Sequence, residues 1–281
     1  MTIQCESNTV YDGKGQLIED VDTAFKIKAG VSNVTIKNYK FRNVTYGVLG
    51  QKNGDSESCN ITVENCEMHN DPGSDPYVDK EGQNSGVNGQ DTGAGILVYG
   101  NGVFHDVKVT KNVCTGLARI LLTGEEARAW TIFGNRSDGS EDTSIYVKGH
   151  NSIITWNCVV DSGKCGIKVR NNKDVNAASG GHLIECNYVE NFSMIKPDGG
   201  GCFNVAVPAL VQYNVGVLNK WPAGKKDPGA SARCFAYSGN NIVSRGNKAS
   251  TYDSSKYFGF KIDIKAKYTN CRNDETTFIE N

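Results

Sequence analysis

Short apolar segments recur along the whole chain and are separated by Gly, Asn, Asp and Ser. Each segment usually follows a small residue; the members are 47–49, 95–98, 120–122, 145–147, 166–169, 203–205, 235–237 and 259–262. Their first apolar residues lie 48, 24, 25, 22, 36, 32 and 25 positions apart. Such short apolar pieces predict β-strands, because no stretch shows a sustained helical period. The first interval is either two short coils or one coil with an insertion.

A second register pairs an aliphatic residue with an Asn three positions later. Its members are Val109/Asn112, Ile132/Asn135, Ile154/Asn157, Ile184/Asn187 and Val211/Asn214, and Asn247 follows with one extra residue. A unit of two or three strands cannot bury its own apolar side, so such units must stack on one another. Successive strands then pair in parallel at about 4.8 Å. Asn side chains stacked at one corner bond one another and the turn backbone.

These registers predict an all-β protein, a parallel β-helix of about nine to ten coils with an Asn ladder. Residues 1–281 are expected to form a single domain. An antiparallel sandwich or jelly roll also has short strands, but it does not need fixed columns of Asn and aliphatic residues. Insertions are predicted at 69–92, 189–201 and 216–232. Each precedes a strand of the first register, so all three are expected to share one side of the solenoid and to wall a groove.

Two opening segments resemble a known family. Residues 8–15 read NTVYDGKG and residues 31–38 read VSNVTIKN. They are similar to the opening coils of pectin-lyase-like β-helices, in which a DGxG turn precedes a gvsNVTIkN strand. The resemblance implies a single-stranded right-handed parallel β-helix, a fold used by lyases, hydrolases, epimerases, phage tailspikes and adhesins. Such proteins usually cap the first coil with a helix, and none precedes Thr2, so the chain is expected to be part of a larger one.

The net charge limits the kinds of partner that we expect, and the cysteine spacing indicates the role of the thiols. The formal net charge of −1 argues against a nucleic-acid or anionic-membrane partner, and no apolar run approaches a bilayer span. Residues 1–5 lack a signal-peptide pattern. The ten Cys show no metal-binding spacing, so most are expected to be small buried hydrophobes. Cys202 and Cys234 precede a Phe in successive coils and are expected to stack, either as a disulfide or as thiols.

Side-chain alternation places candidate functional residues on one outward face. If the aliphatic residues of 145–147 point inward, Tyr146 and Lys148 point outward, and Lys168 and Arg170 do so one coil later. By the same count the neighbouring outward pairs are Leu97 and Tyr99, Leu121 and Thr123, and Asn204 and Ala206. Lys148 and Arg170 are 22 residues apart and are expected to stack. Neighbouring cations repel unless an anion compensates, so the column predicts an anionic sugar site.

The predicted chemistry is β-elimination on a uronic-acid polysaccharide. Such a reaction needs a base, a group that neutralises the uronate carboxylate and a proton donor for the leaving oxygen. Lys148 is predicted as the base, with its pKa lowered by the neighbouring cation, and Arg170 as the neutralising group. Tyr146 or Tyr99 is predicted as the donor. The alternative is that the three cations Lys148, Lys168 and Arg170 only solvate an exposed strand.

Two segments resemble the family 6 polysaccharide lyases, the alginate lyase and chondroitinase B type. Residues 145–149 match the base strand, E-x-I-S-x-K-S, and residues 167–171 match the arginine strand, L-x-L-R-H. The sequence departs from the family at three positions: Gly149 replaces a serine, Asn171 a histidine and Thr143 an acidic residue. Glu141 matches the family's outer calcium ligand, and Asp142 is expected to substitute for the missing one. The resemblance therefore implies a Ca²⁺ site at these two residues.

Further residues are expected to contact the glycan. The predicted substrate-binding residues are Lys168, Tyr99, Thr123, His150, Asn204 and Trp221, the last as an exposed aromatic that stacks on a sugar ring or packs onto the solenoid wall. The acidic residues of the first insertion, Asp71, Asp75, Asp79, Glu81 and Asp91, suit Ca²⁺ but have no recognised ligand spacing, which favours a solvated loop. The histidines at 69, 105, 150 and 182 fall at turns without common spacing, so no metal centre or catalytic triad is predicted.

Three functions follow from these residues. The first is a polysaccharide lyase acting on an acidic polysaccharide. The second is a non-catalytic or receptor-binding β-helix, such as a phage tailspike domain, for which a homotrimer would be expected. The third is a glycoside hydrolase, for which the candidate carboxylates are Glu125, Glu126, Asp138, Glu141 and Asp142. In each case the expected location is extracellular or on a virion surface.

Overall fold

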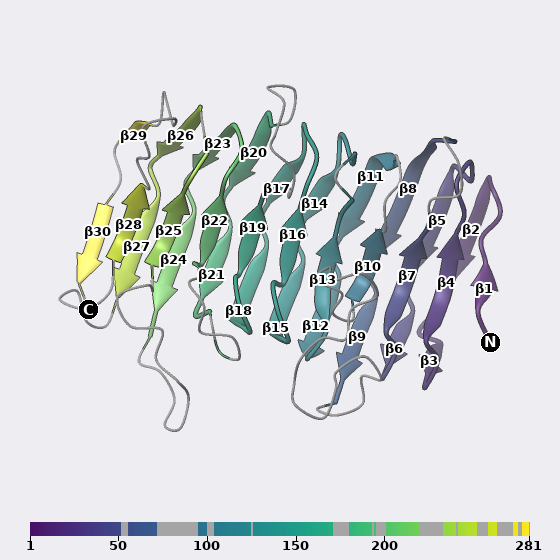
Figure 1. Ribbon diagram of the computed structural model, residues 1–281. Helices are drawn as coiled ribbons and strands as arrows, with labels where there is room; N and C mark the ends of the chain where they lie inside the picture. Colours follow the sequence, from purple (N-terminus) through teal and green to yellow (C-terminus); the bar gives the residue numbers. More distant parts are fainter. Residues whose placement is uncertain are drawn as a thin grey trace.

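The structure is a computed structural model that describes residues 1–51, 56–71, 95–99, 104–124, 126–170, 180–192, 194, 201–219, 233–239, 241–251, 258–262, 272–274 and 277–280. At positions 98–99 and beyond residue 251 only the backbone is described. The described strands form three parallel sheets of ten strands each, and successive coils contribute one strand to every sheet (Figure 1). The predicted fold, a right-handed parallel β-helix, is confirmed.

The sheets are named A, B and C in the order in which each coil visits them. Sheet A contains β1 (Ile3–Gln4), β4 (Thr23–Ile27), β7 (Tyr46–Gly50), β10 (Gly95–Tyr99), β13 (Arg119–Leu122), β16 (Ile145–Val147), β19 (Ile167–Val169), β22 (Phe203–Val205), β25 (Arg233–Tyr237) and β28 (Phe258–Ile262). Sheet B contains β2 (Thr9–Asp12), β5 (Val34–Lys37), β8 (Ser58–Glu64), β11 (Phe104–Thr110), β14 (Thr131–Phe133), β17 (Ile153–Thr155), β20 (His182–Glu185), β23 (Ala209–Gln212), β26 (Ile242–Arg245) and β29 (Arg272–Asp274). Sheet C contains β3 (Leu17–Glu19), β6 (Lys40–Arg42), β9 (Glu67–Asn70), β12 (Val113–Gly116), β15 (Arg136–Ser140), β18 (Cys158–Ser162), β21 (Tyr188–Glu190), β24 (Val215–Leu218), β27 (Lys248–Thr251) and β30 (Thr277–Glu280).

The long sequence intervals are explained by the strand pairing. β7 pairs directly with β10, so the 48-residue interval is one coil with an insertion. The three predicted insertions begin within β9, β21 and β24 and end before β10, β22 and β25. Each therefore connects sheet C to sheet A, and most of their residues lie outside the described residues. Among the described residues, no helix has the length and apolar character needed to cross a membrane.

The core is built from columns of apolar side chains that stack from coil to coil. One column of sheet A consists of Phe25, Val48, Leu97, Leu121, Ile145, Ile167, Phe203 and Phe235. The rings of Phe203 and Phe235 stack with centroids 4.8 Å apart and planes 3° apart. Burying each such side chain contributes about 1.5–3 kcal/mol. The periodic apolar pattern therefore supplies the main stabilising contacts between coils.

The predicted Asn ladder is confirmed and lies at the corner between sheets B and C. Its rungs are Asn112, Asn135, Asn157, Asn187, Asn214 and Asn247, all buried. In each step the backbone N–H and side-chain amide of one Asn donate to the Oδ1 of the next, at 2.9–3.0 Å. The same amides also donate to carbonyls of an earlier coil. These bonds satisfy polar groups that would otherwise be buried without partners.

The register of the fifth coil corrects part of the sequence-based prediction. β13 pairs Leu121, rather than Ile120, with Ile145. Thr123 consequently shares the inward column of Val147 instead of the outward column of the cations. All four residues of β13 are buried, so the sequence shows no alternation there that would fix the register. The predicted outward positions that were wrong are Leu97, Leu121 and Thr123, and that of Tyr99 falls on a side chain outside the described residues.

Cysteines serve as small core side chains. Cys202 and Cys234 are buried in successive coils on either side of the space left by Gly216. Both are free thiols, so the thiol alternative holds rather than the disulfide. Burial raises the pKa of the Cys202 thiol well above its ordinary value. Nine cysteines lie among the described residues, and all are free.

Candidate functional site

Three predicted site residues, Tyr146, Lys148 and Lys168, form a contact cluster on the outer face of sheet A. Lys168 Nζ lies 4.3 Å from the centre of the Tyr146 ring, and Lys148 Nζ lies 5.1 Å from it. Tyr146 packs with Leu122 and Tyr46 in an apolar group separate from the main core. Its exposed fraction is 0%, and that of Lys148 is 6%. The two lysines therefore make cation–π contacts in a covered environment rather than solvating an exposed strand.

The main chain of Lys148 is held by the preceding coil. Thr123 Oγ1 accepts a hydrogen bond from the Lys148 N–H at 2.7 Å and donates to the Lys148 carbonyl at 3.2 Å. The next residue, Gly149, has φ +85°, and a Cβ there would come within 1.9 Å of the Ala127 carbonyl oxygen. This close approach and the positive φ explain why position 149 is a glycine. The hydroxyl of Thr123, a predicted substrate contact, thus bonds the main chain of Lys148.

Arg170 continues the cationic column one coil after Lys148. Val147 pairs with Val169, and the Arg170 N–H donates to the Val147 carbonyl at 3.1 Å. Lys148 and Arg170 are therefore in register, as predicted, although Arg170 is exposed and Lys148 is covered. Asn204 pairs with Lys168 in the following step and is half-buried. The accessible part of this face consequently lies around Arg170 and Asn204.

Charge is segregated on the outer face of sheet A. Two outward columns run from β4 to β25, one through Tyr146 and one through Lys148. Their charged members at the described positions are Lys26, Lys28, Lys148, Lys168 and Arg170, with no Asp or Glu among them. The whole chain carries a net charge of −1, so the positive charge of these two columns differs from that of the chain as a whole. A single-sign face attracts anions by long-range electrostatics.

The predicted calcium ligands Glu141 and Asp142 are buried in the turn between β15 and β16. Asp142 Oδ2 lies 4.0 Å from Arg119 Nη2, and both side chains are 1% exposed. Arg119 thus supplies a positive charge beside Asp142. No group of three His, Cys, Asp or Glu that could hold a metal occurs among the described residues. The calcium site that the resemblance implies at Glu141 and Asp142 therefore stays a prediction.

His150 lies at the corner between sheets A and B, beside the buried His182. His182 Nδ1 accepts a hydrogen bond from the Ser152 N–H at 3.3 Å, and Nε2 lies 3.0 Å from the Gly149 carbonyl. This pattern assigns the proton to Nε2 of a neutral ring. Burial lowers the pKa of His182 to about 4, in keeping with that neutral form. His182 therefore fixes the turn that follows Lys148, and His150 is half-buried there.

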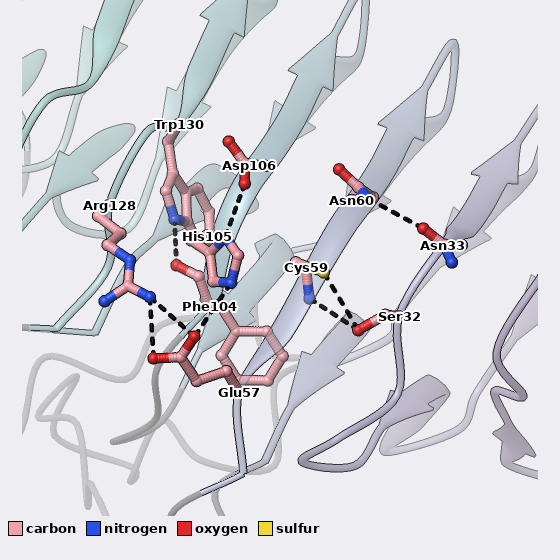
Figure 2. Close-up of polar contacts among 10 residues, drawn as sticks. All are labelled: Ser32, Asn33, Glu57, Cys59, Asn60, Phe104, His105, Asp106, Arg128 and Trp130. Carbon is pink, nitrogen blue, oxygen red and sulfur yellow. Dashed lines mark hydrogen bonds and ion pairs between the residues drawn. The ribbon is translucent and has the colours of Figure 1, made fainter.

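A charged cluster that the sequence did not predict lies on the same corner of earlier coils (Figure 2). Both carboxylate oxygens of Glu57 lie 2.8 Å from Arg128 Nη2, and Oε2 lies 3.3 Å from His105 Nε2. His105 Nδ1 contacts Asp106 Oδ2 at 2.6 Å. Single backbone bridges align His105, Arg128 and His150 in successive coils. His105 and His150 therefore lie two coils apart in one column. The sequence-based prediction missed this spacing because Arg128 occupies the coil between them.

Two predicted substrate contacts cannot be placed in the site. The backbone of Tyr99 lies in β10, but its side chain is outside the described residues, as is Trp221. The carboxylates of the first insertion after Asp71 are also outside them. Asp71 itself contacts Arg42 at 3.4 Å and His69 at 3.0 Å. The partners of Asp71 are therefore protein side chains of the neighbouring strands.

Comparisons with known proteins complete the description. No protein-family model matches the chain, and no curated protein matches it significantly. Among solved structures the chain is similar to the crystal structure of the Dettilon tailspike protein, with a TM-score of 0.45 and 14% sequence identity. The match covers 98% of this chain and 59% of that chain, so this chain spans less than two thirds of that protein's length. The fold assignment rests on the strand register and the Asn ladder, and the resemblance to polysaccharide lyases stays a prediction.

Proposed function

We propose that this β-helix binds an acidic glycan along the outer face of sheet A. The observation that carries the proposal is the charge of that face, whose described columns hold five cations and no carboxylate between β4 and β25. Arg170 is the exposed cation next to the covered lysines, and its guanidinium suits bidentate contact with a uronate. Asn204, half-buried in the next coil, is placed to bond a neighbouring hydroxyl.

Binding is favoured over cleavage because of the burial of the two groups that would act on the substrate. A general base has to approach within hydrogen-bond distance of the proton that it removes. Lys148 and Tyr146 are both covered, and the amine of Lys148 faces the Tyr146 ring. In this arrangement the lysines contribute positive potential to the face while Arg170 makes the direct contact.

β-Elimination is the second candidate function. The observation in its favour is the register of Lys148 and Arg170 in adjacent coils, with the Tyr146 ring between two amines. In that reaction Lys148 removes the proton beside the uronate carboxylate, Arg170 neutralises the carboxylate, and Tyr146 protonates the leaving oxygen. The mechanism requires both covered side chains to become accessible when the glycan binds.

One experiment separates these functions. The protein is titrated with pectate, alginate and chondroitin sulfate at low ionic strength, and the ultraviolet absorbance of unsaturated uronate is followed in the same samples. Binding without absorbance is the expected result. An increase in absorbance that Lys148→Ala abolishes would establish the lyase instead.

Two Arg variants make the test specific. Arg170→Ala is expected to weaken binding about tenfold or more, because a charge-assisted contact is lost. Arg136→Ala removes another exposed cation, from sheet C, where Arg136 lies 3.9 Å from Asp138, and is expected to leave binding unchanged. Equal losses in both variants would refute a site on sheet A, as would the absence of binding to every acidic polymer.

A further inference from the structure

A second feature of the solenoid lies on the corner between sheets B and C, away from the cationic face. In the coils containing β11 to β26, the residue before each ladder Asn has a left-handed backbone. These residues and their φ values are Lys111 at 56°, Gly134 at 65°, Trp156 at 58°, Cys186 at 52°, Tyr213 at 55° and Gly246 at 58°. The column projects from the corner because the Asn that follows each member is buried.

Trp156 and Tyr213 are unusual occupants of this column. Glycine adopts a left-handed backbone without strain, and it stands there in the coils before Trp156 and after Tyr213. A bulky residue with positive φ is an outlier, and such residues concentrate at functional sites. Burial does not compensate for the strain, since Trp156 is 65% exposed and Tyr213 is 48% exposed. The two aromatic side chains are therefore not explained by folding.

The spacing and seating of the two rings suit an extended ligand. One coil separates the two aromatic residues, so their backbones lie about 9.6 Å apart, which is two strand spacings. The intermediate position holds the small Cys186. The Tyr213 ring rests on Gly246, where a Cβ would come within 2.7 Å of Cδ1 and Cε1. The absence of a side chain on Gly246 thus leaves room for the ring.

Polar side chains with planar groups line the adjacent column of sheet B. Thr155, Glu185, Gln212 and Arg245 pair in successive coils, next to the column of the aromatic residues. Gln212 Nε2 donates to Glu185 Oε2 at 2.9 Å, which holds both side chains in place. Aromatic faces flanked by a fixed amide–carboxylate pair and an exposed guanidinium match a sugar ring, which is apolar on its faces and carries hydroxyls around its edge.

We propose that Trp156 and Tyr213 form a carbohydrate-binding site for an uncharged glycan, whose alternate sugar rings stack on the two aromatic side chains. Glu185 and Gln212 bond the hydroxyls of the glycan between the two aromatic residues, and Arg245 bonds those one coil beyond Tyr213. The site differs from the cationic face in position and chemistry, so it does not depend on the function proposed for sheet A.

The test replaces each aromatic residue with glycine, the residue that occupies the same position in a neighbouring coil. Trp156→Gly and Tyr213→Gly place the residue of the neighbouring coils in the same left-handed position, so both variants are expected to fold with unchanged or slightly raised thermal stability. The probes are soluble β-glucan, galactomannan, xyloglucan and dextran, examined by affinity electrophoresis and by quenching of tryptophan fluorescence. Wild-type protein is expected to bind at least one of them, and each variant is expected to bind it about tenfold more weakly.

Controls distinguish this site from its alternatives. Val10→Ala, which trims an exposed apolar side chain in the first coil, is expected to leave glycan binding unchanged. Arg170→Ala is expected to affect acidic polymers alone. No binding to any uncharged glycan, or full binding by Trp156→Gly, would overturn the proposal. Concentration-dependent self-association that Trp156→Gly abolishes, without glycan binding, would overturn it in favour of an interface between copies of the chain.

Discussion

Replacing Asn157 with Ala removes the central rung of the buried ladder. Asn157 Oδ1 accepts from the backbone and side-chain amides of Asn135, and its Nδ2 donates to Asn187 Oδ1 and to the carbonyls of Ile132 and Thr155. All five bonds are lost in the variant, and the Asn135 N–H is left buried. We take about 0.5 kcal/mol net for each of the five bonds, the low end of the usual range because three of them share the two Nδ2 hydrogens, and about 1–3 kcal/mol for the buried unsatisfied N–H. The free energy of unfolding should therefore fall by about 3.5–5.5 kcal/mol.

An exposed ladder in the first coils provides the matched control. Asn33 Nδ2 donates to Asn8 Oδ1 at 2.8 Å. Asn33 Oδ1 accepts from Asn60 Nδ2 at 3.0 Å (Figure 2). Asn33→Gly removes both bonds while keeping the left-handed backbone, and it should cost about 1 kcal/mol or less because water replaces them. Urea unfolding at neutral pH, followed by far-ultraviolet circular dichroism, measures both variants. Equal losses of stability would refute the role assigned to the buried ladder.

Three further predictions concern the core and the two corner clusters. His182 is neutral in the folded state with a pKa of about 4, against 6.5 for its ordinary value, so its contribution to stability is complete above pH 6.5 and is lost as the pH falls toward 4. The free energy of unfolding should fall by about 3 kcal/mol across this window, and His182→Asn should lack that part of the pH dependence; parallel curves for the two proteins would contradict this. Phe235→Ala should destabilise the fold by about 3–5 kcal/mol in urea unfolding, because the ring stacks on Phe203 in the core, and a loss below about 1 kcal/mol would contradict that packing. Glu57→Gln weakens two exposed ion pairs and should change thermal stability by less than about 1 kcal/mol, with a smaller effect in high salt; a larger loss that is independent of salt would show that the cluster is structural.

The sequence predicted the architecture because a solenoid repeats its pattern. The columns of Asn and aliphatic residues identified coils of 22 to 36 residues, and the structure stacks these coils into three parallel sheets. The prediction failed at β13, where four consecutive buried residues leave no alternation to set the register. It succeeded for the alignment of Lys148 with Arg170, because 145–147 and 167–169 both alternate.

Burial and long-range charge pairing were not accessible from the sequence. Outward direction was inferred for Lys148 correctly, but whether an outward side chain is covered depends on the surrounding coils and connections. The cluster of Glu57, His105 and Arg128 joins residues from three coils through side-chain contacts. The sequence contained one indication of this alignment, since His105, Arg128 and His150 are spaced by about one coil length. The spacing cannot be recognised from the histidines alone, because the middle residue is an arginine.

Hydrogen–deuterium exchange in the presence of an oligouronate tests the proposed binding face most directly. Backbone amides of β19 and β22, and those of residues 170 and 206 just beyond them, should exchange more slowly when the glycan is bound. Wild-type protein should show this protection at low salt and lose it in Arg170→Ala. Protection confined to sheet C, to the corner of Trp156 and Tyr213, or to no part of the chain would contradict a glycan-binding site on sheet A.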